Sequence, residues 1–152
     1  MMSTINPDHW LWRLSAQAWL QASKNELSIA HANCHIRRVA LTHCRRSAGM
    51  ALNAILVYSA EPTAETRWGR SYVEHLQIVA KADDSLRKPL TENSSLAAKK
   101  LLEIPVVDSS HLVQIHRSGG QVVQSAIQHA QAIYDDCACL MTPFDPTKSN
   151  SD

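Results

Sequence analysis

The strongest helical pattern in the chain lies between residues 32 and 58. Apolar or small side chains recur there at steps of three and four, and further apolar residues fill most of the remaining circumference. The recurring set is Leu41, Cys44, Ala48, Leu52 and Ile55. A helix that is apolar around most of its surface packs at the centre of a bundle rather than at its edge. We therefore predict a central helix over residues 32–58.

Other segments carry shorter helical patterns, separated by proline or charged breaks. The predicted helices cover residues 9–30, 67–81, 93–103 and a last segment that runs on to about 141. Ser118 and Gln121 have the spacing of a capping box and mark the predicted start of the last helix. Residues 106–116 instead place short apolar runs on either side of Asp108, a pattern typical of a small β-hairpin.

The composition supports one helical domain. The chain has 152 residues, of which 45% are hydrophobic and 19% charged, and only 4 are glycine. Such a length can bury a core without disulfides, and so few glycines argue against a turn-rich β-sandwich. We expect an all-α, antiparallel bundle of four to five helices over residues 9–141, with flexible tails at 1–8 and 142–152. The net charge of +1 predicts no general affinity for nucleic acid.

The same sequence predicts a cytoplasmic protein without a membrane anchor, metal or cofactor. No run approaches the roughly 20 apolar residues that span a bilayer, and the first residues lack the pattern of a secretory signal. In a reducing compartment the four cysteines are expected to be thiols. His31 and His35 have helical spacing for a shared metal, but the Glu-x-x-His signature of di-iron bundles and a glycine-rich phosphate loop are both missing.

Two segments resemble the first two helices of the HEPN family, which is named for a nucleotide-binding domain of higher eukaryotes and prokaryotes. Residues 19–30 read WLQASKNELSIA and residues 45–56 read RRSAGMALNAIL. They match the family's tryptophan-leucine start, its acidic-leucine-alanine segment and its alanine-rich helix with a leucine ending. Residues 70–76 resemble the start of its third helix. Gly49 and Asn53 depart from the pattern, since a basic residue is common on that face.

The resemblance implies a bundle of four or five helices, commonly a homodimer. It also implies one of two roles: a nucleotide-binding partner of a nucleotidyltransferase, or a ribonuclease. Catalytic members carry an arginine followed after four to six residues by a histidine. Arg70 and His75 have that spacing, as do Arg38 and His43. A histidine can move the 2′-hydroxyl proton while a guanidinium stabilises phosphate charge. Because the chain holds eight histidines, chance alone is expected to produce such pairs.

Polar residues form one narrow seam on the predicted central helix. Four of them give a positive stripe that could hold a phosphate: His35, Arg38, Arg45 and Arg46. The alternative is that these arginines are solvated or pair with acidic residues of the bundle, such as Glu26. Gly49 interrupts the seam and indicates close approach of another backbone, either within the chain or across a dimer.

We therefore expect a noncatalytic accessory module that associates with nucleotides or RNA. We expect it to form a homodimer and to act with a separate partner protein, for which a nucleotidyltransferase is the candidate. One alternative is a metal-independent endoribonuclease in which Arg70 orients the phosphate and His75 is the acid and base. Another is a protein-interaction bundle that exposes Trp10 and Trp12. Core packing is the simplest role of Trp10, Trp12 and Trp19, and base stacking is the competing one.

Overall fold

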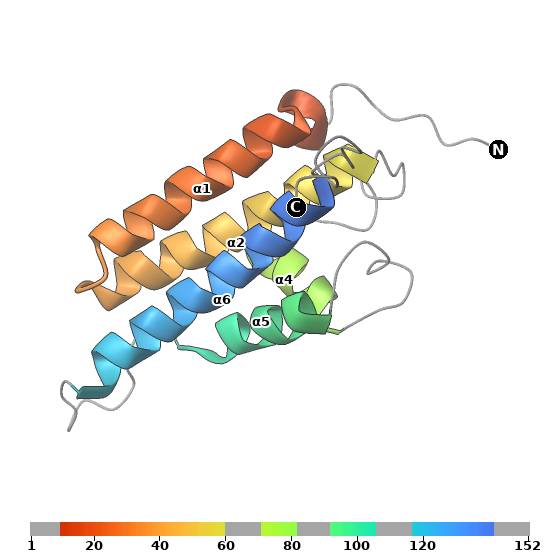
Figure 1. The fold of residues 1–152 in the computed structure, drawn as a ribbon. Helices are drawn as coiled ribbons and strands as arrows, with labels where there is room; N and C mark the ends of the chain where they lie inside the picture. The colour runs from red at the N-terminus through yellow and green to blue at the C-terminus, as the bar shows by residue number, and fades with distance from the viewer. Residues whose placement is uncertain (1–9, 60–70, 82–91, 106–116, 142–152) are drawn as a thin grey trace, which may run out of the picture.

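The computed structural model describes residues 10–59, 71–81, 92–105 and 117–141 (Figure 1). Every regular element in this part of the chain is helical, so the predicted all-α bundle is confirmed. The elements are a 3-10 helix, Trp10–Arg13, followed by α1 (Ala16–Ala32), α2 (Arg37–Ser59), α4 (Tyr72–Ala80), α5 (Glu92–Glu103) and α6 (Arg117–Met141). The hairpin predicted at residues 106–116 and the tails lie outside the described residues.

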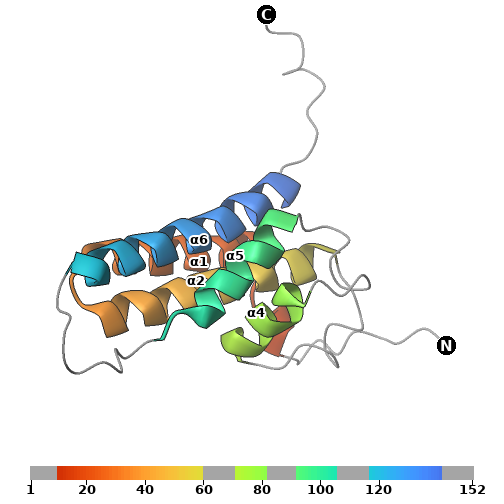
Figure 2. The same cartoon turned by 90° about the horizontal axis from the view of Figure 1, so that it is seen from below.

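Helix α2 is the centre of the bundle, as its apolar pattern predicts. It contacts α1, α4, α5 and α6, and Leu52 and Ile55 are only 1% and 4% exposed. Figure 1 shows α1 running antiparallel to α2, while α6 lies beside both and runs in the direction of α2. Seen from below in Figure 2, α5 packs against α6 and α4. The buried faces of the five α-helices that the structure describes meet in one hydrophobic core.

The predicted continuous helix over 9–30 is wrong at its start. The 3-10 helix ends at Arg13, and α1 begins only at Ala16. Ser15 separates the two because its backbone is extended, and its hydroxyl accepts a hydrogen bond from the Ala18 amide at 3.1 Å. A serine N-cap of this kind satisfies an amide that has no partner within the helix. The chain therefore turns between the 3-10 helix and α1.

Two other predicted boundaries are also shifted. Helix α2 begins at Arg37 rather than at residue 32, because Asn33 ends α1 by donating its side-chain amide to the Ile29 carbonyl at 2.8 Å. The backbone is already helical at Arg117, so Ser118 lies within α6 and does not cap it. The predicted helix over 93–103 is confirmed as α5.

Two buried serines join α1 to α2. The Ser23 hydroxyl donates to the Ser47 carbonyl at 2.7 Å, and the Ser47 hydroxyl donates to the Ser23 carbonyl at 2.9 Å. Both side chains are completely buried. Small side chains let the two helices approach closely, and the reciprocal bonds satisfy both hydroxyl donors. This pair fixes which turns of α1 and α2 lie opposite each other.

Gly49 brings α2 and α4 together. An ideal Cβ atom added at Gly49 would lie 2.5 Å from the Tyr72 Cβ atom and 2.6 Å from its Cγ atom. Real Cβ atoms do not approach other carbons so closely, so Tyr72 packs where a side chain of residue 49 would be. The sequence predicts a backbone as the close neighbour of Gly49; the structure instead places the Tyr72 side chain there, within the same chain.

All four cysteines lie in the described residues and are free thiols, as predicted. Among the helices that the structure describes, none has the length and hydrophobicity required to cross a bilayer.

The Gly49–Tyr72 contact predicts that Gly49→Ala destabilises the protein, by about 1–3 kcal/mol, because overpacking displaces Tyr72 or α4. Gly120→Ala is the matched control. A Cβ atom there meets nothing within 4 Å, so the alanine should raise stability by about 0.5–1 kcal/mol through its better helix propensity. Urea unfolding of both variants measures the difference, and shifts in the same direction would contradict the close contact.

Candidate functional site

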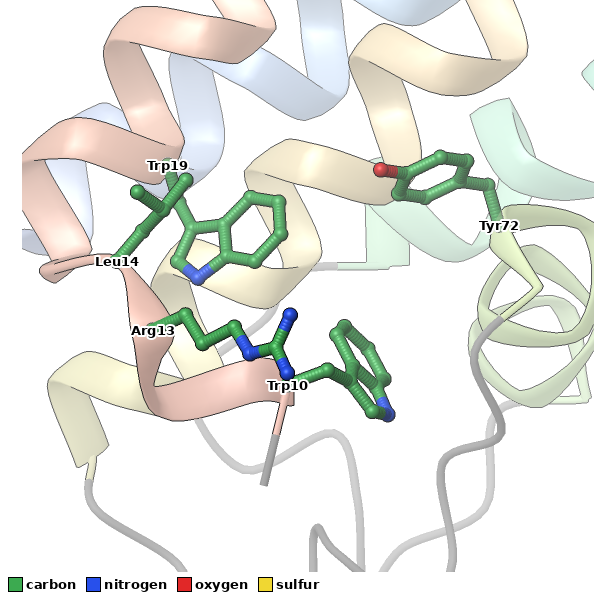
Figure 3. A pocket seen from close by; sticks show the side chains of 5 residues that line it. All are labelled: Trp10, Arg13, Leu14, Trp19 and Tyr72. Atoms are coloured by element: carbon green, nitrogen blue, oxygen red, sulfur yellow. The ribbon is translucent and has the colours of Figure 1, made fainter. Parts of the chain in front are cut away.

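An open pocket lies at the end of the bundle where the 3-10 helix meets α1 and α4 (Figure 3). Its volume is about 390 Å³. Three aromatic rings, one arginine and one leucine line it: Trp10, Arg13, Leu14, Trp19 and Tyr72. These residues come from three separate elements, so the pocket exists only in the folded chain.

The turn at Ser15 builds one side of this pocket. It lays the 3-10 helix across the start of α1, and the Trp19 indole N–H donates to the Leu11 carbonyl at 2.9 Å. Leu11 is completely buried and anchors the 3-10 helix in the core. Trp10 meets Trp19 edge to face, with ring centroids 6.2 Å apart. The two indoles are therefore held in a fixed relation by packing and by a hydrogen bond.

His75 supports the pocket from inside the protein. Its ring stacks on Trp10, with centroids 5.9 Å apart and planes 12° apart, and meets the edge of Tyr72 at 6.1 Å. The side chain is completely buried. A substrate therefore cannot reach this predicted catalytic histidine in the structure as it stands. Arg70, its predicted partner, lies outside the described residues.

Arg13 gives the pocket its charge. The residue is exposed, and its guanidinium group extends between Trp10 and Trp19 in Figure 3. Among the described residues it has no ion-pair partner. A free guanidinium beside aromatic faces can bind an anion while a planar group stacks on the rings.

The four residues of the predicted positive stripe have different surroundings. Arg45 donates to the carbonyls of Leu101 and Ile104 at 3.1 and 2.6 Å, at the end of α5. Burial lowers its pKa, but an arginine remains cationic at neutral pH. Its guanidinium donates to one carbonyl of the last turn of α5 and to one just after the helix, where helix geometry supplies no amide donor. Arg45 thus joins α2 to α5.

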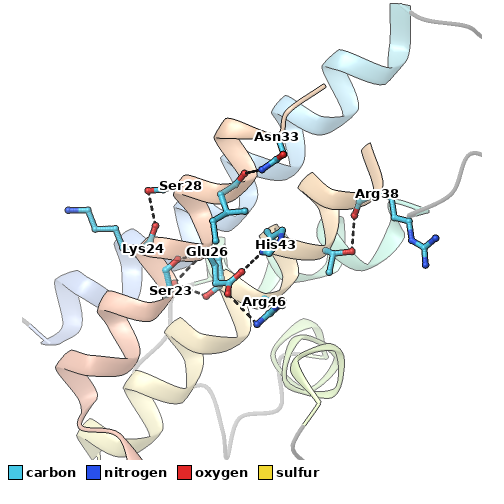
Figure 4. Close-up of polar contacts among 11 residues, drawn as sticks. Ser23, Lys24, Glu26, Ser28, Asn33, Arg38, His43 and Arg46 are labelled. Carbon is cyan, nitrogen blue, oxygen red and sulfur yellow. Dashed lines mark hydrogen bonds and ion pairs between the residues drawn. The ribbon is translucent and has the colours of Figure 1, made fainter. Parts of the chain in front are cut away.

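Arg46 belongs to a second interhelical cluster (Figure 4). Its guanidinium lies 3.3 Å from one carboxylate oxygen of Glu26 on α1, and His43 Nδ1 contacts the other oxygen. Glu26 is 9% exposed. Arg46 therefore pairs with Glu26, which is the alternative to phosphate binding that the sequence left open for the arginines of the seam.

The remaining stripe residues, His35 and Arg38, are exposed at the other end of the bundle from the pocket. Figure 4 shows the Arg38 side chain pointing away from His43, so the second arginine–histidine spacing does not bring the two groups together. The predicted stripe is therefore divided. His35 and Arg38 are exposed to solvent, whereas Arg45 and Arg46 contact residues of other helices.

Another open pocket, of about 310 Å³, lies between the end of α1 and α6. Its polar lining includes His31, Gln124, Gln128, Gln131 and Asp135. It contains neither an aromatic ring stack nor an arginine among these lining residues. Within the described ranges no group of three potential metal ligands occurs.

Sequence reasoning found only part of the aromatic pocket. It singled out Trp10 and Trp19, with base stacking as the less favoured role, but not Arg13, Leu14 or Tyr72. The N-cap signal of Ser15 could have revealed the turn that brings Arg13 over the pocket. No local signal identifies Tyr72, because Gly49 predicts a close neighbour without naming it.

Comparison of the chain with models of known families, with curated proteins and with solved structures finds no match.

The Glu26 cluster predicts that Glu26→Ala lowers stability by about 1–3 kcal/mol, because His43 and Arg46 lose a largely buried acceptor. Glu74→Ala is the control, since Glu74 is exposed on α4 and its loss should change stability by less than about 0.5 kcal/mol. Chemical denaturation at pH 7 compares them. Equal stability of the two variants would show that the cluster contributes nothing to the α1–α2 contact.

Proposed function

We propose that the protein is a HEPN-like, noncatalytic module that binds nucleotides or single-stranded RNA through the aromatic pocket. The observation that carries this proposal is the combination of Trp10, Trp19 and Tyr72 around one opening with the guanidinium of Arg13, which forms no ion pair within the described ranges. Single-stranded nucleic acids bind to such surfaces because bases stack on aromatic side chains and phosphates pair with cations.

The volume and the charge of the pocket suit a small ligand, or a short part of a larger one, that is bound at this pocket alone. A pocket of about 390 Å³ falls within the range of typical small-ligand sites. With a net charge of only +1, the protein has little long-range attraction for polyanions. Recognition should therefore depend on stacking and on the single arginine rather than on a broad basic surface.

The accessory role follows from the resemblance to the HEPN family together with this pocket. A helical module that holds a nucleotide or an RNA end suits a homodimer that presents this ligand to a nucleotidyltransferase. The homodimer and the enzyme partner stay predictions from the resemblance.

Binding of a dye-labelled oligouridylate, followed by fluorescence anisotropy, tests the pocket. We expect Arg13→Ala to weaken binding about 10-fold or more, because hydrogen bonds to charged groups contribute about 1.5–3 kcal/mol. Arg38→Ala is the matched control. It removes an exposed arginine of the predicted stripe far from the pocket, and it should change the affinity less than about twofold.

The opposite result, a loss of binding in Arg38→Ala alone, would assign the RNA to the stripe of α2. Electrophoresis of the same samples tests catalysis. We expect intact RNA with every variant, whereas cleavage by the unmodified protein that disappears in His75→Ala would establish the ribonuclease alternative.

A further inference from the structure

Asn53 is a buried polar residue that has no hydrogen-bond partner in the part of the chain that the structure describes. Its side chain is completely inaccessible to solvent in the second half of α2, and neither the amide nitrogen nor the amide oxygen is paired there. Other buried polar groups differ from Asn53 in this respect. The hydroxyls of Ser23 and Ser47 hydrogen-bond across the α1–α2 contact, and the Glu26 carboxylate has two partners. Burying an unpaired amide costs stability, so such a group in a folded protein needs an explanation.

The helical position of Asn53 directs it toward the junction of α1 and α4. It lies one turn beyond Gly49, whose surface meets Tyr72 of α4. It also lies two turns beyond Arg46, whose side chain reaches Glu26 of α1. Residues four and seven apart share one face of a helix. Asn53 therefore faces both α1 and α4, as does the aromatic pocket.

The pairing of α1 with α2 places Asn53 at the same level along the bundle as Trp19. The two helices are antiparallel, and Glu26 of α1 lies opposite Arg46 of α2. Moving seven residues back along α1 and seven forward along α2 carries this pair to Trp19 and Asn53. Trp19 lines the pocket, so Asn53, which is not itself a lining residue, lies at the level of the pocket along the bundle.

We propose that the Asn53 amide is the specificity-determining group of this pocket, where it hydrogen-bonds the edge of a nucleobase. This inference rests on the proposed nucleotide-binding function. A carboxamide offers an acceptor next to donors, which matches the adjacent donor and acceptor on a base edge. A sugar phosphate or a simple anion has no such edge.

The path to Asn53 passes Gly49. The Tyr72 side chain covers Gly49 in this structure, with its Cβ and Cγ atoms in close contact, so this path opens when α4 shifts and carries Tyr72 away from α2. A flat base can then stack against Trp10 or Trp19 and reach the Asn53 amide at its edge. In the free protein the unpaired amide lowers the stability, and a base that hydrogen-bonds to the amide removes this free-energy cost.

Asn53→Leu separates this role from a packing role. Leucine has a similar size and no polar atoms, so the unliganded variant should unfold at a higher urea concentration than the original protein. Calorimetric titration with uridine and adenosine monophosphates should show affinities about 5- to 150-fold lower, the effect of one bidentate base contact. The affinity for ribose 5-phosphate, which has no base, should stay unchanged.

Asn33→Leu is the matched control. The Asn33 amide has a partner in the Ile29 carbonyl, so this variant should unfold at a lower urea concentration and keep its nucleotide affinities. If Asn53→Leu also unfolds at a lower urea concentration than the original protein and keeps its nucleotide affinities, Asn53 is a packing residue. The inference is then overturned, while the proposed function stands. If the unmodified protein binds neither nucleotide, the proposed function fails and the inference fails with it.

A ligand change makes the same test without a variant, in case Asn53→Leu does not fold. A ribonucleotide that carries benzimidazole as its base keeps an aromatic face but lacks exocyclic amino and carbonyl groups. The unmodified protein should bind it about 5- to 150-fold more weakly than the natural nucleotides. Equal affinities would overturn the role of Asn53 and leave stacking on the tryptophans intact.

Discussion

The reciprocal hydrogen bonds between Ser23 and Ser47 determine how α1 lies along α2, and the rest of the molecule depends on that register. Neither helix can slide without leaving a buried hydroxyl and a carbonyl unpaired. On one side of this pair the register places Glu26 opposite Arg46. On the other side it places Trp19 at the pocket. A structural contact in the core therefore sets the geometry of the candidate site.

The sequence predicts the central helix well because its signal is local and redundant. Leu41, Leu52 and Ile55 belong to an apolar arc that only a bundle centre can bury. Gly49 also predicts a close contact, since a helix interior rarely tolerates glycine without a packing reason. The start of α1 escapes prediction because the apolar spacing runs on through Leu14, while one hydroxyl at Ser15 decides where the helix begins.

The site is less predictable because each of its residues has an acceptable local explanation. Trp10 and Trp19 suit a buried helix face, and an isolated Arg13 suits a solvated one. Their placement around one opening appears only when the turn at Ser15 and the close contact at Gly49 bring three elements together. The groups that Arg45 and Arg46 contact are also far from them in the sequence. Sequence places Arg45 and Arg46 side by side, but α5 engages the first and α1 the second.

The position of the buried polar groups argues that this end of the bundle is not built for stability alone. Near the middle of the α1–α2 contact, the buried hydroxyls and Glu26 all have partners that join helices. Beside the pocket, Asn53 keeps an amide that contributes no hydrogen bond in the free protein, and His75 occupies a core position behind Trp10. An apolar residue of the same size would fill the position of Asn53 at a lower cost of desolvation. Local departures from good packing chemistry are frequent where proteins bind ligands, and the unpaired amide of Asn53 lies at the end of the bundle that holds the aromatic rings and Arg13.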